Sequence, residues 1–217
     1  MIDAIILCGG RAKRLGIDIP KPLIGVREKR LIQRQIEWLR GSKNIGKIIL
    51  AVGKSKDVFD YAKTLDNNVI VVYEDEPLGT GGALKNVLDN ANMSEEFILI
   101  NDDLANVDID ELLNIPGCVV CVQNPRSTFG VVEIDEENNV KAFREKLTLT
   151  DHWVSIGIVK LVKNEVYPNL PEKGDIEYET YPKLKMKVFK HNGYWYPIND
   201  KKQLEAANEF FSDGNEN

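Results

Sequence analysis

The stretch ILCGGRAKRLGIDIPKPL, residues 6–23, joins an apolar run to a glycine pair and then to a cluster of cations. The apolar run extends from residue 2 to Cys8, which is typical of a parallel strand buried on both faces. Gly9 and Gly10 allow backbone amides to approach a ligand closely. Although the chain has a net charge of −6, four basic residues follow this strand closely: Arg11, Lys13, Arg14 and Lys21. The pattern indicates an anion-binding loop at the end of the first strand.

The first half of the chain alternates strand patterns with helix patterns. Apolar runs at residues 2–8, 46–53, 67–75 and 95–103 predict four strands, and residues 30–42, 55–65 and 79–91 predict the helices between them. This order is typical of an α/β fold with an open, Rossmann-like, doubly wound and mostly parallel sheet. Ligands of such sheets bind beyond the carboxyl ends of the strands.

From about residue 108 the pattern changes to strands and short helices. We expect strands at 118–124 and 152–162, a hairpin over 129–146 that turns at 136–139, and a short helix within 175–184. A second hairpin-like pair is expected over 185–199 with its turn at Asn192-Gly193, followed by a helix over 200–211. No linker divides the chain, so we expect one domain, residues 1–217, in which the second half extends the sheet of the first.

Composition excludes several classes of protein. A pI near 5.1 gives no excess of basic residues for general nucleic-acid binding. No apolar run approaches the roughly 20 residues of a membrane span, and the N-terminus lacks the basic region of a signal peptide. We therefore expect a cytoplasmic protein with no nucleic-acid or membrane partner.

The three cysteines, Cys8, Cys118 and Cys121, do not form the even-numbered framework of a small secreted protein. Cys118 and Cys121 form a CxxC pair, which could serve redox chemistry or a metal. Alternation along a β-branched run favours another interpretation, in which both are buried on opposite faces of a strand.

Three motifs fall at predicted strand ends: the Gly9-Gly10 loop, the LGTGG segment at 78–82, and the sequence Asn101-Asp102-Asp103. The first loop matches neither the P-loop nor the dinucleotide GxGxxG pattern. Two carboxylates at a strand end can hold a divalent cation, and magnesium prefers carboxylates, waters and substrate phosphates. Singly, each motif could be a turn with solvated charges or a helix cap; together they favour a site for a phosphorylated ligand.

In this order and spacing, the segments LCGG, PKPL, EPLGTGGAL, FILINDD, VDIDEL, FGVVEID and AFREK resemble the sugar-1-phosphate nucleotidyltransferases, or nucleotide-sugar pyrophosphorylases. The chain is most similar to those that transfer guanylyl groups to mannose or heptose 1-phosphates. The resemblance implies a nucleotide-diphospho-sugar transferase fold, with a nucleotide-binding half at about 1–107 and a sugar-phosphate-binding β region at about 108–217. It also implies Mg²⁺, and a reaction in which NTP and a sugar 1-phosphate give an NDP-sugar and pyrophosphate.

The resemblance assigns expected roles to particular residues. Arg14 and Lys21 correspond to the cations at the reacting phosphates, and Asp103 to a metal ligand. The residues expected around the nucleotide are Leu7, Gly9, Gly10, Arg11, Lys13, Glu74, Gly79, Thr80 and Gly81. Those expected at the sugar phosphate are Gly130, Glu145, Lys146 and Ser155.

The chain departs from the family pattern at two sites. In the first loop, Ala12 replaces a glycine and Lys13 replaces a hydroxyl residue, which alters the phosphate-binding geometry. Near the C-terminus, Pro197 stands where many relatives have a metal-binding aspartate. The pattern Pro-Ile-Asn-Asp aligns instead with relatives that use an asparagine, so Asn199 is the expected second metal ligand and Asp200 its substitute. The alternative is that Asn199 caps the last helix.

Glu74 bears on the choice of base. A carboxylate only accepts hydrogen bonds, which suits the adjacent N–H groups of guanine and favours GTP, unless Glu74 faces solvent. The alternatives are a UTP- or dTTP-dependent hexose-1-phosphate enzyme, the same fold with a non-sugar phosphate acceptor, and a non-catalytic nucleotide-sugar-binding regulator. We expect a monomer or a homodimer.

Overall fold

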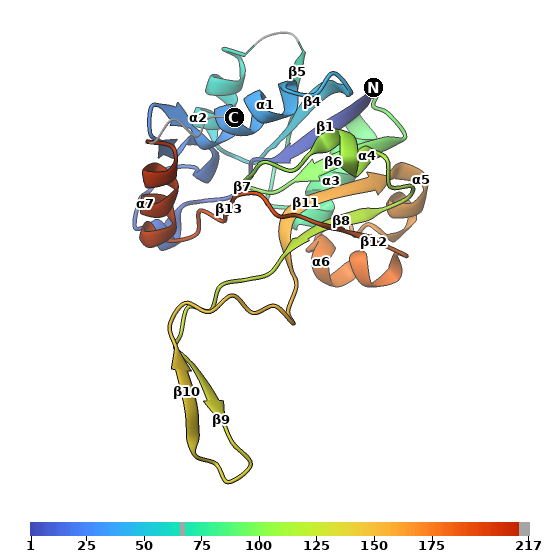
Figure 1. Ribbon diagram of the computed structural model, residues 1–217. Helices are drawn as coiled ribbons and strands as arrows, with labels where there is room; N and C mark the ends of the chain where they lie inside the picture. The colour runs from blue at the N-terminus through green and yellow to red at the C-terminus, as the bar shows by residue number, and fades with distance from the viewer. Residues whose placement is uncertain (66–67, 213–217) are drawn as a thin grey trace.

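The centre of the molecule is one seven-stranded sheet. The computed structural model describes residues 1–65 and 68–212, and its sheet has the strand order β12-β8-β11-β6-β1-β4-β5 (Figure 1). The four strands predicted in the first half are β1 (Ile2–Leu7), β4 (Ile45–Val52), β5 (Val69–Tyr73) and β6 (Glu96–Ile100). They pair in parallel, and residue 67 of the predicted third strand lies outside the described residues.

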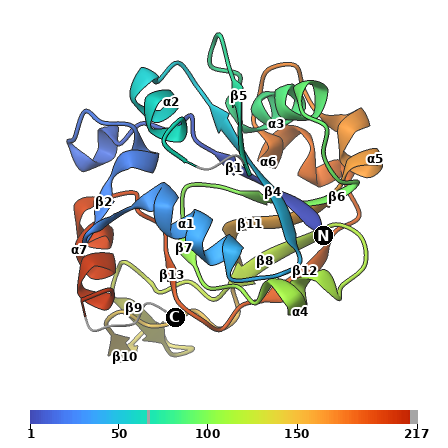
Figure 2. The same ribbon diagram turned by 90° about the horizontal axis from the view of Figure 1, so that it is seen from above.

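Helices cover both faces of this sheet, as a doubly wound fold requires. The buried residues of β1 alternate between two cores: Ala4 and Ile6 pack in one, and Ile5 and Leu7 in the other. The first core includes side chains of α1 (Leu31–Arg40), α2 (Lys56–Ala62) and α4 (Ile109–Leu113). The second includes side chains of α3 (Gly79–Asn90), α5 (Lys163–Val166) and α6 (Ile176–Glu179). Figure 2 shows α1 and α4 on one side of the strands and α3, α5 and α6 on the other.

The second half extends the same sheet. Its strands are β8 (Val119–Gln123), β11 (Val154–Val162) and β12 (Lys187–Lys190). β11 runs antiparallel to both β6 and β8, and β12 pairs in parallel with β8. The predicted mostly parallel α/β sheet is confirmed, with β11 as its antiparallel member.

The two predicted hairpins had different outcomes. The first is confirmed: β9 (Val131–Ile134) and β10 (Val140–Arg144) pair and project as an arm away from the sheet (Figure 1). The second prediction was wrong, because β12 pairs with β8 and β13 (Trp195–Tyr196) pairs with β7 (Leu104–Ala105). The edge of β8 offers a longer ladder than a local hairpin, so the Asn192-Gly193 turn joins two different sheets.

The C-terminal helix holds the first loop in place. Asp200 accepts a hydrogen bond from the backbone N–H of Gln203 and thereby caps α7 (Lys201–Phe210). Ala207 and Phe211 join a third apolar cluster with Ala12 and Leu15 of the first loop. The remaining short elements are η1 (Lys13–Leu15), η2 (Lys21–Leu23), β2 (Gly25–Val26), β3 (Lys29–Arg30), η3 (Tyr167–Asn169) and η4 (Tyr181–Lys183).

Within the described ranges, no helix combines the length and the apolar character that crossing a membrane needs. The prediction for the CxxC pair is confirmed: both cysteines are buried and free, with Cys118 in the second core and Cys121 in the first. Burial raises the pKa of Cys121 to about 12 and raises that of Cys8 further.

We predict that the native protein resists modification by a thiol reagent at pH 8. Buried thiols with raised pKa values supply almost no accessible thiolate. Titration with Ellman's reagent should detect all three cysteines, Cys8, Cys118 and Cys121, in denaturant and essentially none in buffer. Rapid reaction of any of them in the native state would contradict their buried positions.

Candidate active site

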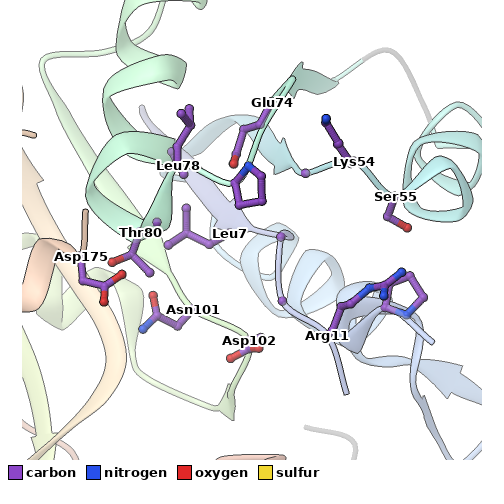
Figure 3. Close-up of a pocket in the computed structure, with 17 residues that line it drawn as sticks. Leu7, Arg11, Lys54, Ser55, Glu74, Leu78, Thr80, Asn101, Asp102 and Asp175 are labelled. Atoms are coloured by element: carbon purple, nitrogen blue, oxygen red, sulfur yellow. The ribbon is translucent and has the colours of Figure 1, made fainter. Parts of the chain in front are cut away.

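A pocket of about 600 Å³ opens beyond the carboxyl ends of β1, β4, β5 and β6, where the fold predicts a ligand. Figure 3 shows Thr80 and Asp175 on one side of it and Arg11 on the other. The lining residues are Leu7, Gly9, Gly10, Arg11, Pro20, Gly53, Lys54, Ser55, Glu74, Pro77, Leu78, Gly79, Thr80, Ala83, Asn101, Asp102 and Asp175. Seven of the residues expected around a nucleotide are therefore brought together: Leu7, Gly9, Gly10, Arg11, Glu74, Gly79 and Thr80.

The first loop exposes backbone at the pocket. A Cβ added to Gly9 would meet no heavy atom within 4 Å, whereas one added to Gly10 would lie 3.0 Å from the Asp102 carboxylate. Ala12 has a φ of −78° and is buried, so the position that relatives fill with glycine needs no left-handed backbone here. Lys13 and Arg14 lie on the exposed η1 turn and are not among the lining residues, so their phosphate contacts stay predictions.

Lys21 is the most constrained cation of the site. Its side chain is buried, with 6% exposed, and its Nζ lies 2.9 Å from Asp102 Oδ1 and 3.9 Å from Asp103 Oδ1. The same nitrogen donates a hydrogen bond of 3.0 Å to Asn199 Oδ1. The backbone is fixed as well, because the N–H of Lys21 donates to the carbonyl of Gly10.

The segment Asn101-Asp102-Asp103 after β6, here called the aspartate turn, is held in place by side chains from two other elements. Gln35 of α1 donates from Nε2 to the carbonyls of Asn101 (2.7 Å) and Asp103 (2.9 Å), and Trp195 Nε1 donates to Asp103 Oδ2 at 3.2 Å. Burial raises the pKa of Asp103 to about 6, and the neighbouring Asp102 charge contributes. Gln35 was not anticipated, because only packing shows that this side chain crosses to the strand end.

The donor chemistry of this cluster fits Mg²⁺. Oxygens of Asp102, Asp103 and Asn199 converge on one cation, the Lys21 ammonium, and hard oxygen donors are those that magnesium prefers. Among the described residues there is no group of three or more acidic, histidine or cysteine side chains arranged to hold a metal alone. Substrate phosphates and waters would therefore complete the coordination by Asp103 and Asn199. Asp200 caps α7 through its carboxylate, so the cap of this helix is not Asn199. Asp200 as a substitute metal ligand stays a prediction.

The glycine loop at 78–82 is clamped by a segment of the second half. Gly79 has a φ of +76°, and the backbone N–H of Gly81 donates to the carbonyl of Gly174. Thr80 Oγ1 donates to Glu177 Oε2 at 2.8 Å and accepts from the N–H of Ile176. Gly81 therefore packs behind the pocket instead of lining it.

Two further pocket regions were missed by sequence reasoning. Asp175, at the start of α6, reaches the pocket because the 171–177 segment packs on the glycine loop. Lys54 and Ser55 line the pocket just after β4. Their position at the end of a parallel strand is the sequence feature that could have identified them as pocket residues.

Glu74 does not face solvent. Only 5% of the residue is exposed, burial raises the pKa of its carboxylate, and the backbone N–H of Leu78 donates a hydrogen bond to it. The carboxylate thus lies at the wall of the pocket, where it also supports the glycine loop.

The expected sugar-phosphate residues lie apart from this pocket. Gly130 and Glu145 are close neighbours at the root of the β9–β10 arm, since a Cβ on Gly130 would lie 3.0 Å from Glu145 Oε1. Lys146 follows them with a φ of +54°, and Ser155 lies on β11. None of the four lines the pocket, so their roles stay predictions.

Comparison with known proteins places this site in a family. The profile of the nucleotidyl transferase family matches residues 3–196. The chain is 32% identical, over 212 residues, to D-glycero-alpha-D-manno-heptose 1-phosphate guanylyltransferase of Campylobacter jejuni, covering 91% of this chain and 94% of that protein. The chain belongs to the nucleotidyl transferase family. It is therefore a member of an enzyme family, as the motifs predicted.

Other relatives share the same region. The bifunctional protein GlmU of Methanococcus maripaludis is 34% identical over 232 residues, which cover 97% of this chain and 54% of that protein. The crystal structure of HddC from Yersinia pseudotuberculosis complexed with GMP-PN superimposes with a TM-score of 0.78 at 26% identity, covering 97% of this chain and all of that one. This chain thus has the predicted nucleotide-diphospho-sugar transferase fold.

We predict that Mg²⁺ raises the unfolding midpoint of a Lys21→Met variant more than that of the wild type. The ammonium lies where the oxygens of Asp102, Asp103 and Asn199 converge, so it competes with a metal for them. Differential scanning fluorimetry with and without Mg²⁺ measures both shifts. Adding Asp103→Asn to Lys21→Met should remove the extra shift, and equal shifts in wild type and Lys21→Met would contradict this placement.

Proposed function

We propose that this protein transfers a nucleotidyl group from GTP to a sugar 1-phosphate, such as mannose or heptose 1-phosphate. The observation that carries the proposal is the pocket itself, in which glycine backbone, Asp102 and buried Glu74 line one space of about 600 Å³. Lys21 lies directly behind this lining, with its Nζ 2.9 Å from Asp102 Oδ1. The heptose 1-phosphate guanylyltransferase of Campylobacter jejuni supports the proposal, because its sequence aligns with this chain over nearly the full length of both proteins.

In the proposed reaction, a phosphate oxygen of the sugar 1-phosphate attacks the α-phosphorus of GTP. The new P–O bond forms as the bond to the leaving pyrophosphate breaks, so the products are GDP-sugar and pyrophosphate. Such a transfer needs positioning and neutralisation of charge more than a covalent intermediate. The chain's groups match this need, because the glycines admit the phosphates and Lys21 supplies a fixed positive charge beside them.

Mg²⁺, when bound through Asp103 and Asn199, would supply further positive charge to the phosphates. Arg11 lines the pocket and Arg14 lies on the following turn, so both are proposed as additional phosphate contacts. Gly130, Glu145, Lys146 and Ser155 are proposed for the sugar phosphate.

Glu74 favours guanine. The N1–H and N2 amino groups of guanine are adjacent donors, and a carboxylate accepts both. The superimposed HddC structure is a complex with GMP-PN, which agrees with a guanine ligand in this fold. The alternatives are UTP or dTTP as donor, a non-sugar phosphate as acceptor, and a non-catalytic nucleotide-sugar-binding regulator. Cytoplasmic location, and the absence of nucleic-acid and membrane partners, stay predictions.

Pyrophosphate release tests the proposal. With GTP, UTP, dTTP, CTP and ATP against a panel of sugar 1-phosphates, we expect the fastest release with GTP and a mannose or heptose 1-phosphate, and none in EDTA. Lys21→Ala and Asp103→Asn should each lower the rate on the order of 10²-fold or more, because each removes charge stabilisation of the transition state. Tight nucleotide-sugar binding without turnover of any pair would favour the regulator instead.

Glu74→Gln should shift donor preference from GTP toward UTP. An amide offers one donor and one acceptor, which matches the N–H and carbonyl edge of uracil better than that of guanine. The measurement is the ratio of kcat/KM for GTP and UTP, with Glu76→Gln as the matched control on the exposed part of the same loop. An unchanged ratio in Glu74→Gln would show that this residue supports Leu78 but does not select the base.

A further inference from the structure

The β9–β10 arm carries an apolar face that nothing in the described structure covers. In the hairpin register Ile134 pairs with Val140, and Val132 pairs with Phe143. These four side chains share one face and are all exposed, Ile134 at 64% and Val140 at 67%. The opposite face carries Val131 and Ala142 together with an ion pair of 2.7 Å between Arg144 Nε and Glu133 Oε1.

An arm of this kind needs a partner surface. A two-stranded hairpin in water is at best marginally stable, and contiguous exposed apolar side chains mark interaction sites. Figure 1 shows the arm extending away from the sheet, so the body of the same chain does not cover this face. The arm is nevertheless anchored firmly, because the backbone N–H groups of Ser127 and Leu149 bond across its root to Leu147 and Pro125.

The tip of the arm is acidic. Asp135, Glu136 and Glu137 follow β9 without a basic residue between them, and Glu136 and Glu137 are exposed. The backbone N–H of Asn139 donates to Asp135 and lowers its pKa, so this carboxylate stays ionised.

The complementary surface lies on the same chain at the edge of the seven-stranded sheet. The segment KLKMKVFK, residues 183–190, contains no acidic residue and exposes four lysines: Lys183, Lys185, Lys187 and Lys190. Its strand β12 is an edge strand, so one side of its backbone is open to pairing. Val188 (52%) and Trp153 (43%) add exposed apolar surface beside these lysines, and Lys190 Nζ lies 4.6 Å from the centre of the Trp153 ring.

We propose that the β9–β10 arm is an assembly arm that docks on the β12 edge of a second copy of this chain. In the dimer, the acidic tip of one copy's arm lies against the lysines of the β12 edge of the other copy. The apolar face of the arm covers Val188 and Trp153 of that second copy. Since every copy carries both surfaces, two copies exchange arms reciprocally and form a closed dimer with two-fold symmetry. The inference is independent of the substrate proposed above.

The test is the mass of the full-length protein in solution, measured by light scattering after gel filtration. The wild type should have twice the 24.5 kDa chain mass. Ile134→Ser/Val140→Ser should have the mass of one chain, because its arm lacks apolar contact. Tyr73→Ser is the matched control, since this 44% exposed side chain lies on β5, at the opposite edge of the seven-stranded sheet from β12, and it should stay dimeric.

Charge-reversal variants test whether the acidic tip of the arm contacts the lysines of the β12 edge. Lys185→Glu/Lys187→Glu and Glu136→Lys/Glu137→Lys should each be monomeric, and the chain that combines all four changes should recover the dimer. Thermal unfolding of each variant checks that the body remains folded. A wild type that stays monomeric would overturn the proposal, as would a dimer that survives Ile134→Ser/Val140→Ser. A combined variant that stays monomeric would overturn docking on the β12 edge.

Discussion

The site depends on one buried cation, the ammonium of Lys21. It binds oxygens from the aspartate turn after β6 and from Asn199, which is 178 residues further along the chain. A buried ammonium is costly without partners, and so are carboxylates at the end of a buried strand. Each therefore stabilises the other, and the first loop, the strand end and the C-terminal segment are held at one point. The same arrangement keeps the oxygens that suit a metal close together before a ligand binds.

A second constraint joins the halves of the molecule. The glycine loop at 78–82 begins α3 in the first half, yet its backbone and Thr80 are hydrogen bonded to the 174–177 segment of the second. A Cβ on Gly82 would lie 2.6 Å from the carbonyl oxygen of Glu172, so only glycine admits this close packing. The second half thus shapes the pocket directly, and Asp175 enters the pocket as a result.

The β9–β10 arm differs from the pocket. Its two strands pair with each other as the local sequence predicts, but its apolar face stays exposed. Alternation and the turn at 135–139 determine how β9 and β10 pair, because hairpin registers are set by neighbouring residues. The apolar residues of its exposed face follow the same period-two pattern as those of a core strand. Pattern alone therefore does not distinguish a face that packs on the same chain from one that a partner covers.

Local pattern by itself determined the α/β class, the first four strands with their helices, the burial of the cysteines and the strand-end motifs, because periodicity and strand-end polarity are local properties. It failed at Asn192-Gly193, where an apparent hairpin turn joins β12 and β13, which pair with β8 and β7 and not with each other. Only the tertiary structure decided that Lys21 contacts Asn199, that Gln35 supports the aspartate turn, that Asp175 reaches the pocket and that Arg14 lies outside it. These contacts join residues far apart in the chain, and such pairs are set by packing of whole elements and not by the sequence around either residue.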